Sequence, residues 1–381
     1  MKNKELRKIL FVDLKVRDQS PAGSLVKSLV INLSADHSIN VITSESDLDV
    51  ERAAKVSQVR IPTWPLLLRY FLFSWRAATI ATKWRKKNCH QVVIATQGQD
   101  AFADIQYAHY CHRWYLSNAF SKAGGSGPRR WIRWLNHYNN ARDERQGFSN
   151  AKLIVAVSTN LADEISTSYG DDIAKKITVI HNPVNVNLYS MPPTFNKQQF
   201  RQRLGFPERS QIAAFVALGD FERKGLKIVL EAAMNLRQEG HDIWLLLVGT
   251  TPDKVESLVA ASGFSKEHLI AVGRQADVRP YLWVSDAFCL PSTYETASLV
   301  MLEARAAGLP LVVTEVGYAL PLVDNGHGGV IVERTPSSVF KGLKDVLEPG
   351  QSWGPIPPGF DVPAFHTAWR NVIRQVTEMS S

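Results

Sequence analysis

The sequence contains few cysteines, and these do not suggest a disulfide framework. Three occur among 381 residues, at Cys89, Cys111 and Cys289. Their number is odd and their spacing wide, whereas disulfide-rich secreted domains are short and carry an even number of closely spaced cysteines. No signal-peptide pattern opens the chain. We therefore expect a protein of the reducing cytoplasm.

Long hydrophobic runs and metal-ligand patterns are also missing. A spanning helix needs about 20 consecutive apolar residues, and the best candidate, residues 65–82, is interrupted by Arg69 and Arg76. No group of histidine, cysteine and aspartate residues has the spacing of a metal site. We expect no transmembrane helix, no metal and no cofactor.

Size and composition indicate a globular protein of two domains. Apolar residues make up 45% of the chain and charged residues 21%, which is ordinary for a globular protein. A chain of 381 residues is too long for one hydrophobic core. Short apolar runs alternate with helical segments, a pattern that predicts doubly wound parallel sheets of Rossmann-like type. The elements expected from this alternation are strands at 8–14, 40–43, 91–96 and 104–110, a turn at 20–24, helices at 25–35, 66–87 and 362–377, and a second βαβ series from 212.

Positive charge is concentrated in one part of the chain. Residues 51–150 hold 16 Lys and Arg against 5 Asp and Glu, although the net charge of the whole chain is only +8. Cations interleaved with tryptophan favour the headgroup region of an anionic membrane. A basic patch also suits nucleic acid, but no nucleic-acid-binding motif is present, so we expect an anionic membrane surface and no nucleic acid. Six of the ten tryptophans fall in this region, namely Trp64, Trp75, Trp84, Trp114, Trp131 and Trp134.

Two glutamates near the carboxyl end carry the strongest chemical signal. A short apolar strand at 286–291 precedes Glu295, and apolar residues then recur at helical spacing from 297 to 307. Glu295 is therefore predicted in a strand-to-helix loop at the carboxyl edge of a sheet, where open α/β folds bind ligands. Glu303 is predicted about two turns into the helix. The free N–H groups at the start of this helix would form an anion site, made by Ala297, Ser298 and Leu299.

A pair of carboxylates also raises the possibility of a glycosidase, and the spacing argues against it. At about 1.5 Å per residue, eight residues place Glu295 and Glu303 up to ~12 Å apart. The acid/base or nucleophile pairs of glycosidases lie only about 5 to 9.5 Å apart. One glutamate near a reacting sugar and one further along a bound nucleotide fits the spacing better.

This segment resembles the Glu-x7-Glu motif of the retaining glycosyltransferases of family 4, which have the GT-B fold of two Rossmann-like domains facing across a cleft. The run Phe221-Glu-Arg223-Lys224-Gly225 is similar to the family's diphosphate-binding turn, and Val272-Gly273-Arg274 to its base-contacting loop. Together with Val316-Gly-Tyr318-Ala, these motifs look closest to the lipopolysaccharide-core glucosyltransferase branch. The resemblance is specific over residues 151–335 and holds only in outline before residue 150.

The resemblance implies a role for each of these residues. Arg223 and Lys224 would hold the diphosphate, and Gly273 and Arg274 would lie beside the base. Glu303 would bind the ribose hydroxyls, and Glu295 would orient the donor sugar. Arg223 and Lys224 could instead be a solvated helix start, Glu303 an exposed helix carboxylate, and Glu295 a capping carboxylate near the helix dipole.

Expectations for the first domain are less specific. Gly23 would let the backbone approach the phosphates closely, although the family usually has a double glycine where this chain has Ala22-Gly23. His109, at the end of a predicted strand, is where the family often places a histidine facing the donor sugar, and His112 is the alternative. Many family members also carry an arginine at the position of Leu218.

One motif is interpreted as a decoy. Asp47-Leu-Asp49 imitates the Asp-x-Asp metal motif of the other glycosyltransferase fold but lies too early in the chain, so we expect a solvated loop. The expected domains are residues 1–189 on the acceptor side, 190–358 for the nucleotide sugar, and a final helix within 359–381 that crosses back to the first domain, as in the resembled fold.

The resemblance implies a cytoplasmic, peripherally membrane-associated retaining enzyme without a metal. It would move a hexose from a nucleotide sugar, a uridine diphosphate hexose before guanosine diphosphate mannose, to a surface glycan or glycolipid such as lipopolysaccharide core or an exopolysaccharide precursor. A nucleotide-sugar epimerase remains an alternative, but no acid/base pair is found for it. A catalytically silent protein that binds a nucleotide sugar or docks at the membrane is the other alternative.

Overall fold

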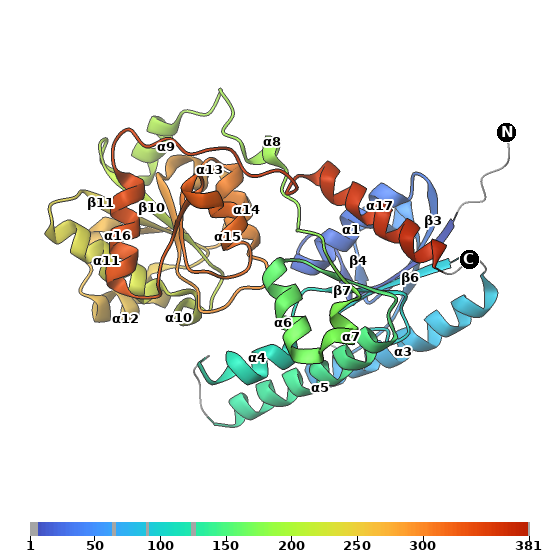
Figure 1. Cartoon of the computed structure of the whole chain (residues 1–381). Helices are drawn as coiled ribbons and strands as arrows, with labels where there is room; N and C mark the ends of the chain where they lie inside the picture. Colours follow the sequence, from blue (N-terminus) through green and yellow to red (C-terminus); the bar gives the residue numbers. More distant parts are fainter. Residues whose placement is uncertain (1–6, 63–65, 89–90, 123–126, 380–381) are drawn as a thin grey trace. The chain divides into compact units, whose positions relative to one another are not determined.

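The computed structural model describes residues 7–62, 66–88, 91–122 and 127–379. Trp64, Cys89 and the centre of the glycine-rich segment 123–128 lie outside these ranges. The chain forms two compact units, one made of Met1–Asn182 with Pro363–Ser381 (unit 1) and one of Pro183–Val362 (unit 2) (Figure 1). Each unit is built on a parallel sheet, so the predicted α/β class is confirmed.

Unit 1 contains a seven-stranded sheet in the order β5-β3-β1-β6-β7-β8-β9, and every pairing is parallel. The order reverses between β1 and β6, which is where doubly wound folds bind ligands at the carboxyl ends of the strands. The strands are β1 Arg7–Val12, β3 His37–Thr43, β5 Lys55–Gln58, β6 Gln91–Thr96, β7 Ile105–Ala108, β8 Leu153–Ala156 and β9 Ile177–Val179, with a separate short pair β2 Lys15–Val16 and β4 Glu45–Ser46.

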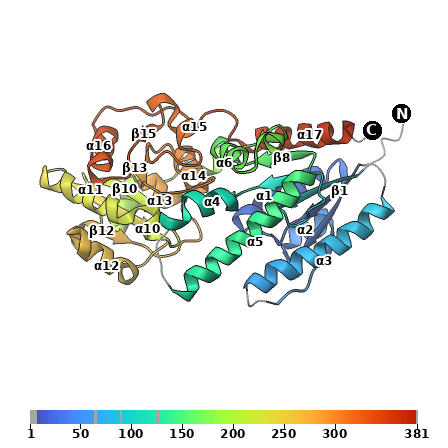
Figure 2. The same cartoon turned by 60° about the horizontal axis from the view of Figure 1, so that its bottom comes forward.

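Helices cover the sheet of unit 1, and the central strands are buried on both faces. The two long helices α3 and α5 lie on the same side of the unit (Figure 2). The helices are α1 Pro21–Leu33, α2 Leu48–Ala53, α3 Leu66–Lys87, α4 His112–Asn118, α5 Pro128–Asn150, α6 Thr159–Tyr169, α7 Asp171–Ala174 and α17 Val362–Glu378, with a 3-10 turn η1 Phe120–Lys122.

Helix α17 joins unit 1 although it closes the sequence. Trp369 is fully buried, with its ring 4.8 Å from that of Tyr107 in β7. His366 lies 2.9 Å from the hydroxyl of Ser28 in α1, and the two helices lie side by side in Figure 1. The last helix thus completes the core of the first unit.

Unit 2 contains a six-stranded parallel sheet in the order β12-β11-β10-β13-β14-β15. This is the doubly wound arrangement, with its reversal between β10 and β13. The strands are β10 Gln211–Val216, β11 Ile243–Val248, β12 Leu269–Ala271, β13 Ala287–Leu290, β14 Leu311–Val313 and β15 Gly329–Ile331. The helices are α8 Val186–Tyr189, α9 Lys197–Leu204, α10 Phe221–Lys224, α11 Leu226–Gln238, α12 Pro252–Ser262, α13 Arg279–Val284, α14 Leu299–Ala306, α15 Ala319–Val323 and α16 Pro336–Leu347, with 3-10 turns η2 Lys266–His268 and η3 Asp324–Gly326.

Several expected boundaries need correction. The segment 20–24 is not a separate turn but the start of α1, because the side chain of Ser20 caps the helix and Pro21 fits its first position. Helix α14 begins at Leu299, so Glu303 lies about one turn into it rather than two. Strand β1 ends at Val12, and strand β5 was not expected. The predicted bounds of α3 and β6 are confirmed to the residue.

The chain passes from unit 1 to unit 2 after Asn182 and returns to unit 1 after Val362. Residues 183–189 belong to unit 2 because Val184 pairs with Asp361 and Tyr189 bonds to Glu303.

Candidate functional site

The turn after β10 holds two cations in a strained, glycine-dependent conformation. Asp220 has φ +55° and Gly225 φ +81°, and helix α10 between them carries Arg223 and Lys224. A Cβ at Gly225 would lie 2.5 Å from the carbonyl oxygen of Pro291, which follows β13. Only glycine tolerates both the positive φ and this close approach. The turn is thereby pressed against the carboxyl end of β13.

Arg223 and Lys224 meet Glu295 across the reversal of the sheet. Lys224 Nζ lies 2.9 Å and Arg223 Nη1 3.2 Å from Glu295 Oε1. The hydroxyl of Ser292 donates to the same oxygen at 3.1 Å. The structure therefore brings together three of the predicted site residues, and Glu295 partners the two cations instead of capping a helix.

A third cation, which the sequence analysis missed, lies close to this cluster. Arg334 Nε donates to the carbonyl of Pro291 at 3.2 Å, and its Nη2 donates to the carbonyl of Glu222. It follows β15, where no motif marks it. Burial lowers the pKa of Arg334, but a guanidinium stays charged at neutral pH.

The cluster gathers several cations, and the side chains at its centre are largely shielded from water. The side chains of Arg223, Lys224 and Glu295 are 22%, 16% and 13% exposed. With Arg334, three cations gather here, and the carboxylates of Asp220 and Glu222 in the same turn are exposed. Such an arrangement favours an anion with several oxygens, because charge-assisted bonds are stronger where water is excluded.

The start of α14 and Glu303 lie on the chain directly after Glu295. Ser298 precedes the first turn of α14 and is buried, but its side chain makes no capping bond, and the predicted N–H groups fall at the helix start. Glu303 accepts a 2.8 Å bond from the hydroxyl of Tyr189. Burial raises the pKa of Glu303, and the Tyr189 bond opposes that rise. Glu303 is thus a partly buried, hydrogen-bonded carboxylate and not a solvated one.

The predicted base-contacting loop follows β12. Gly273 has φ +71°, donates to the carbonyl of Thr250 at 2.8 Å and accepts from the amide of Gly249 at 2.7 Å. These bonds hold the loops after β11 and β12 together at the carboxyl edge. Arg274 is exposed.

In unit 1, Gly23 is required by the fold itself. A Cβ at Gly23 would lie 1.7 Å from the carbonyl oxygen of Lys15, so the chain after β1 passes directly over the first turn of α1. The amide of Gly23 donates to Ser20 Oγ at 3.3 Å. The close approach is therefore to the protein's own backbone, and the predicted approach to a phosphate stays a prediction.

His109 follows β7 and is uncharged. Burial lowers its pKa to about 3, and its Nε2 is buried without a hydrogen-bond partner among the described residues. Its amide donates to the side chain of Gln97 at 2.9 Å. Gln97 has φ +56°, a backbone strain of the kind that collects at functional sites. His109 can bond a hydroxyl group but cannot supply positive charge.

His112 belongs to a buried network instead. Its Nδ1 lies 2.8 Å from His137 Nδ1, and its amide donates to both oxygens of Glu144 at 3.0 and 3.1 Å. Glu144 also accepts from Gln97 at 2.6 Å and from Tyr169 at 2.9 Å. Burial raises the pKa of Glu144 to about 8 and lowers that of His112 to about 3.

Asp13 is a candidate that the sequence analysis missed. It directly follows β1 and is buried, and its Oδ2 has no hydrogen-bond partner among the described residues. Its Oδ1 accepts from the amide of Lys15 at 2.9 Å. Burial raises the pKa of Asp13 to about 6, although the nearby Thr96 hydroxyl and the Lys15 amide favour the charged form. The sequence does indicate Asp13, as a carboxylate directly after an apolar run, but the predicted strand was extended to residue 14 and so included it.

Asp13 and His109 line the same pocket, at the reversal between β1 and β6. Its volume is about 370 Å³, and Lys15, Gln97 and Asp143 also contribute to its wall. An unpaired buried polar group costs about 1–3 kcal/mol. Two such atoms on one pocket indicate a place where a polar ligand completes the hydrogen bonding.

The expectation of a solvated loop at Asp47 and Asp49 needs correction. Lys27 Nζ lies 2.8 Å from Asp18, 3.0 Å from Asp47 and 3.4 Å from Asp49. The two aspartates therefore help to neutralise a buried lysine of α1. Within the described ranges no group of histidine, cysteine and acidic residues is arranged to hold a metal ion.

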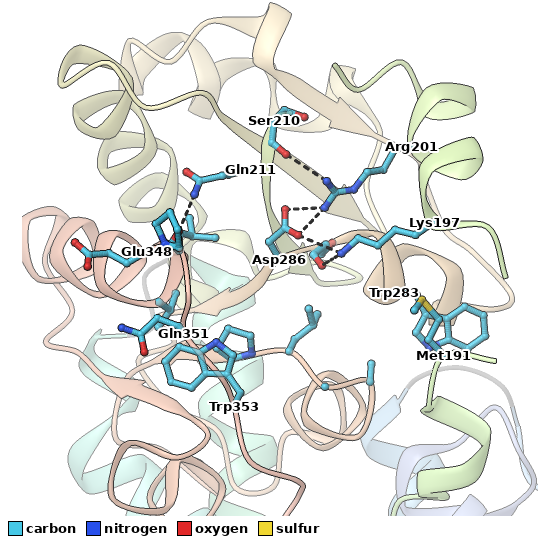
Figure 3. A pocket seen from close by; sticks show the side chains of 18 of the residues that line it. Met191, Lys197, Arg201, Ser210, Gln211, Trp283, Asp286, Glu348, Gln351 and Trp353 are labelled. Atoms are coloured by element: carbon cyan, nitrogen blue, oxygen red, sulfur yellow. Dashed lines mark hydrogen bonds and ion pairs between the residues drawn. The ribbon is translucent and has the colours of Figure 1, made fainter. Parts of the chain in front are cut away.

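A second cavity in unit 2, of about 540 Å³, lies at the opposite edge of the sheet (Figure 3). Its walls include the residues just before β10, β13 and β14. Asp286 accepts 2.6 Å bonds from Arg201 and a 3.1 Å bond from Lys197, and the amide of Ile212 donates to it at 2.9 Å. Because these charges satisfy one another, the cluster stabilises the amino ends of the strands, and the cavity is not a candidate for the chemistry.

The tryptophan-rich region is only partly inside the core. Trp75 of α3 and Trp131 of α5 are 62% and 68% exposed. Ile132, Leu135 and Tyr138 add to an apolar surface on α5. Arg130 and Arg133 lie 5.1 and 5.2 Å from the ring of Phe120. None of the helices within the described ranges is both long and apolar enough to cross a bilayer.

Comparisons with known proteins show which families the chain resembles. Two family models match, "Glycosyltransferase Family 4" over residues 22–188 and "Glycosyl transferases group 1" over residues 212–348. An uncharacterised glycosyltransferase of Methanocaldococcus jannaschii is 23% identical over 353 residues, covering 87% of this chain and 84% of that protein. Lipopolysaccharide glucosyltransferase WaaG of Escherichia coli is 34% identical over 148 residues, only 38% of this chain and 39% of its own length.

Solved structures agree on the fold. A WaaG crystal structure matches with a TM-score of 0.67 at 17% identity, covering 97% of this chain and 95% of that one. The structure of Anabaena HepE with UDP and glucose matches with a TM-score of 0.68 at 19% identity, covering 97% and 100%. The two parallel-sheet units have the GT-B fold of these glycosyltransferases. Since the two family models together match most of the chain, it belongs to glycosyltransferase family 4 and is similar to the lipopolysaccharide-core glucosyltransferases.

Proposed function

We propose that the protein is a retaining glycosyltransferase that moves a hexose from a nucleoside diphosphate sugar to a cell-surface glycan or glycolipid. The observation that carries the proposal is the gathering of Arg223, Lys224 and Glu295 at the carboxyl ends of β10 and β13. This edge of a doubly wound sheet is where a nucleotide is expected. The cluster supplies charge of the sign that a diphosphate needs.

The reaction separates charge, and the site is arranged to stabilise the separated charges. Breaking the bond between sugar and diphosphate leaves negative charge on the leaving group, which Arg223 and Lys224 would hold. The N–H groups at the start of α14 would add favourable dipoles. Glu295 would then exchange its bonds to the two cations for the donor sugar. Glu303 would bind the ribose, with Tyr189 fixing its orientation.

The relatives favour particular substrates. WaaG is a lipopolysaccharide glucosyltransferase, and HepE was solved with UDP and glucose. A uridine diphosphate hexose is therefore the preferred donor and guanosine diphosphate mannose the second. The proposed acceptor is a surface polysaccharide precursor or lipopolysaccharide core.

A thermal-shift panel of UDP, UDP-glucose, UDP-galactose and GDP-mannose tests the donor assignment. A ligand at 100 times its Kd stabilises the protein by about 2.7 kcal/mol. Wild type should respond to one nucleotide family, and the Lys224→Ala variant should respond clearly less at the same concentration. The anomeric configuration of the transferred sugar, followed by NMR, then tests retention. A protein that responds to no nucleotide sugar would contradict the proposal.

The proposed reaction needs no metal, because the fixed cations would take the place of one. Turnover should survive EDTA. Loss of turnover on chelation, restored by magnesium or manganese, would show that this part of the proposal is wrong.

Peripheral attachment to the inner face of the cytoplasmic membrane completes the proposal. The support is the exposed Trp131 and Tyr138 on α5, within the stretch of excess positive charge. Each basic residue near an anionic surface contributes about 1 kcal/mol. Wild type should co-sediment with vesicles containing phosphatidylglycerol, and salt should release it. A Trp131→Ser, Tyr138→Ser double variant that binds as strongly as wild type would exclude this face.

A further inference from the structure

Helix α10, which carries the two central cations of unit 2, is too short to bond all of its own carbonyl groups. It has four residues, Phe221–Lys224, so its carbonyl groups need partners beyond the helix. Two of them find partners on other segments. The amide of Thr293 donates to the carbonyl of Arg223 at 2.8 Å, and Nη2 of Arg334 donates to the carbonyl of Glu222 at 2.5 Å. The position of this turn therefore depends on residues far away in the sequence.

Arg334 joins the turn to the end of β13. Its Nε donates to the carbonyl of Pro291 at 3.2 Å, while its Nη2 bonds to Glu222. The same carbonyl of Pro291 is in close contact with Gly225, where an added Cβ would lie 2.5 Å from the oxygen. Pro291 and Glu222 precede Arg334 by 43 and 112 residues. One side chain thus bonds to both sides of the contact between the turn and the strand.

The loop after β13 has a further anchor that does not involve Arg334. Thr314, which follows β14, donates from its hydroxyl to the carbonyl of Ser292 at 2.6 Å. Ser292 in turn donates to Glu295 at 3.1 Å. Loss of Arg334 should therefore release the turn with the cations, whereas the loop with Glu295 keeps its bonds to the sheet.

A guanidinium is suited to hold two carbonyl groups at once. It presents five N–H donors in a rigid planar fork, and it stays charged at neutral pH. The ammonium of a lysine presents its donors from a single atom at the end of a flexible chain. A lysine at position 334 would keep the charge but would not reproduce the fork.

We propose that Arg334 is a positioning residue for the transfer reaction, which holds the turn of Arg223 and Lys224 against β13 while the donor diphosphate takes these cations from Glu295. The inference rests on the proposed function and gives Arg334 no bond to the substrate. In the free protein the ion pairs with Glu295 also hold the turn. Once the diphosphate replaces Glu295, the bonds from Arg334 remain, because their acceptors are backbone carbonyls for which the donor does not compete.

Calorimetry of Arg334→Lys and Arg334→Ala with UDP and GDP tests the proposal. Affinity for the diphosphate that wild type prefers should fall about tenfold in both variants, because neither can bond the two carbonyls together. A residue that acts by charge alone would leave Arg334→Lys at wild-type affinity. Arg237→Lys is the matched control, since Arg237 also bonds a backbone carbonyl, that of Ile243 at 3.0 Å, but at the amino end of β11. It should bind as wild type does.

A double-mutant cycle with Lys224→Ala shows whether Arg334 acts through the turn. In the Lys224→Ala background, the loss caused by Arg334→Lys should shrink from about tenfold to about threefold, because one of the two cations that it positions is gone. A purely structural role would lower the unfolding temperature of Arg334→Lys without this coupling. An equal loss of affinity in both backgrounds would overturn the proposal.

Wild-type affinity in folded Arg334→Lys would also overturn it. Arg334→Gln, which removes the charge and keeps one amide donor, replaces a lysine variant that does not fold. It should lose affinity to the same extent, and unchanged affinity there would again exclude a positioning role. If wild type binds neither UDP nor GDP, the proposed function fails and this inference fails with it. If wild type binds one of them and Arg334→Lys binds it equally well, only this inference fails.

Discussion

In unit 2 the residues after β10 and β13 meet as an ion cluster, whereas in unit 1 the residues after β1 and β6 form a pocket with uncharged histidines and an unpaired carboxylate. Both sites lie where the strand order reverses. Both also contain one of the few non-glycine residues with positive φ, Asp220 and Gln97. The same position in the fold therefore carries two different sets of side chains in the two units. The cluster in unit 2 is suited to negative charge and the pocket in unit 1 to hydroxyl groups.

Lys224→Ala should have the largest effect of the variants, because it should weaken nucleotide binding in unit 2 and leave the pocket of unit 1 unchanged. It removes a cation from a shielded site, where charge-assisted bonds contribute about 1.5–3 kcal/mol, so affinity for UDP should fall about 10- to 150-fold. Lys227→Ala is the matched control, because Lys227 is half exposed and forms its ion pair with Glu231, at 3.7 Å. Calorimetry with UDP measures both. Neutral-sugar binding in unit 1 should not change, and a parallel loss there would remove the distinction between the two sites.

Gly225→Ala should destabilise unit 2 by more than the backbone strain of an alanine at positive φ would cause by itself. Gly240 has φ +91° with open space around it, so Gly240→Ala reports only the backbone strain, about 1–2 kcal/mol. Gly225→Ala adds the contact with the Pro291 carbonyl and should cost about 1 kcal/mol more. Urea unfolding of the two variants gives the difference. Equal destabilisation would mean that the turn is not pressed against β13 as described.

Glu295→Gln and Glu303→Gln should fail in different ways. Glu295→Gln frees Arg223 and Lys224 from their carboxylate, so UDP affinity should be kept or improved while turnover falls. Glu303→Gln should weaken UDP by about tenfold, or ~1.4 kcal/mol, because a neutral amide accepts ribose bonds less strongly. Steady-state kinetics and calorimetry separate the two. Equal loss of UDP binding in both variants would show that the two roles are wrongly divided.

The smallest predicted effect is a pH dependence that belongs to unit 1. Burial raises the pKa of Glu144 to about 8 in the folded protein, from 4.5, so the folded state binds more protons between these values. Its contribution to stability is present at low pH and is lost as pH rises through 8. Below pH 6.5 the lowered pKa values of His109 and His112 act in the opposite direction.

The informative window for this prediction is therefore pH 6.5 to 8. Over this range the free energy of unfolding of Glu144→Gln should fall by about 1 kcal/mol less than that of wild type. Thermal or urea unfolding at several pH values measures the slope. An unchanged slope in the variant would assign the proton to another group.

The sequence predicted the features that depend on local pattern. Buried strands such as β6 are continuous apolar runs, and helix α3 is framed by breaks in that pattern, so both were placed to the residue. The Arg-Lys-Gly turn and Glu295 were each predicted from a motif, and the structure shows that they are in contact. Contacts between segments far apart in the sequence were not predicted, because no local sequence pattern indicates them. Tyr189 and Glu303 are 114 residues apart, and Lys27 finds Asp47 across 20 residues. Asp13 was missed for a different reason, an overlong strand.

On the ribosome, unit 1 cannot finish folding when residues 1–182 have been synthesised, because its last helix is made at the end of the chain. Residues 1–182 emerge first, but Trp369, which packs on Tyr107 and is fully buried, is among the last residues to be synthesised. Until then the apolar surface of β7 that Trp369 covers stays open to chaperones and to aggregation. Premature termination near residue 360 would therefore leave a complete second unit attached to an unfinished first one, and degradation of such fragments would begin in the older half of the chain.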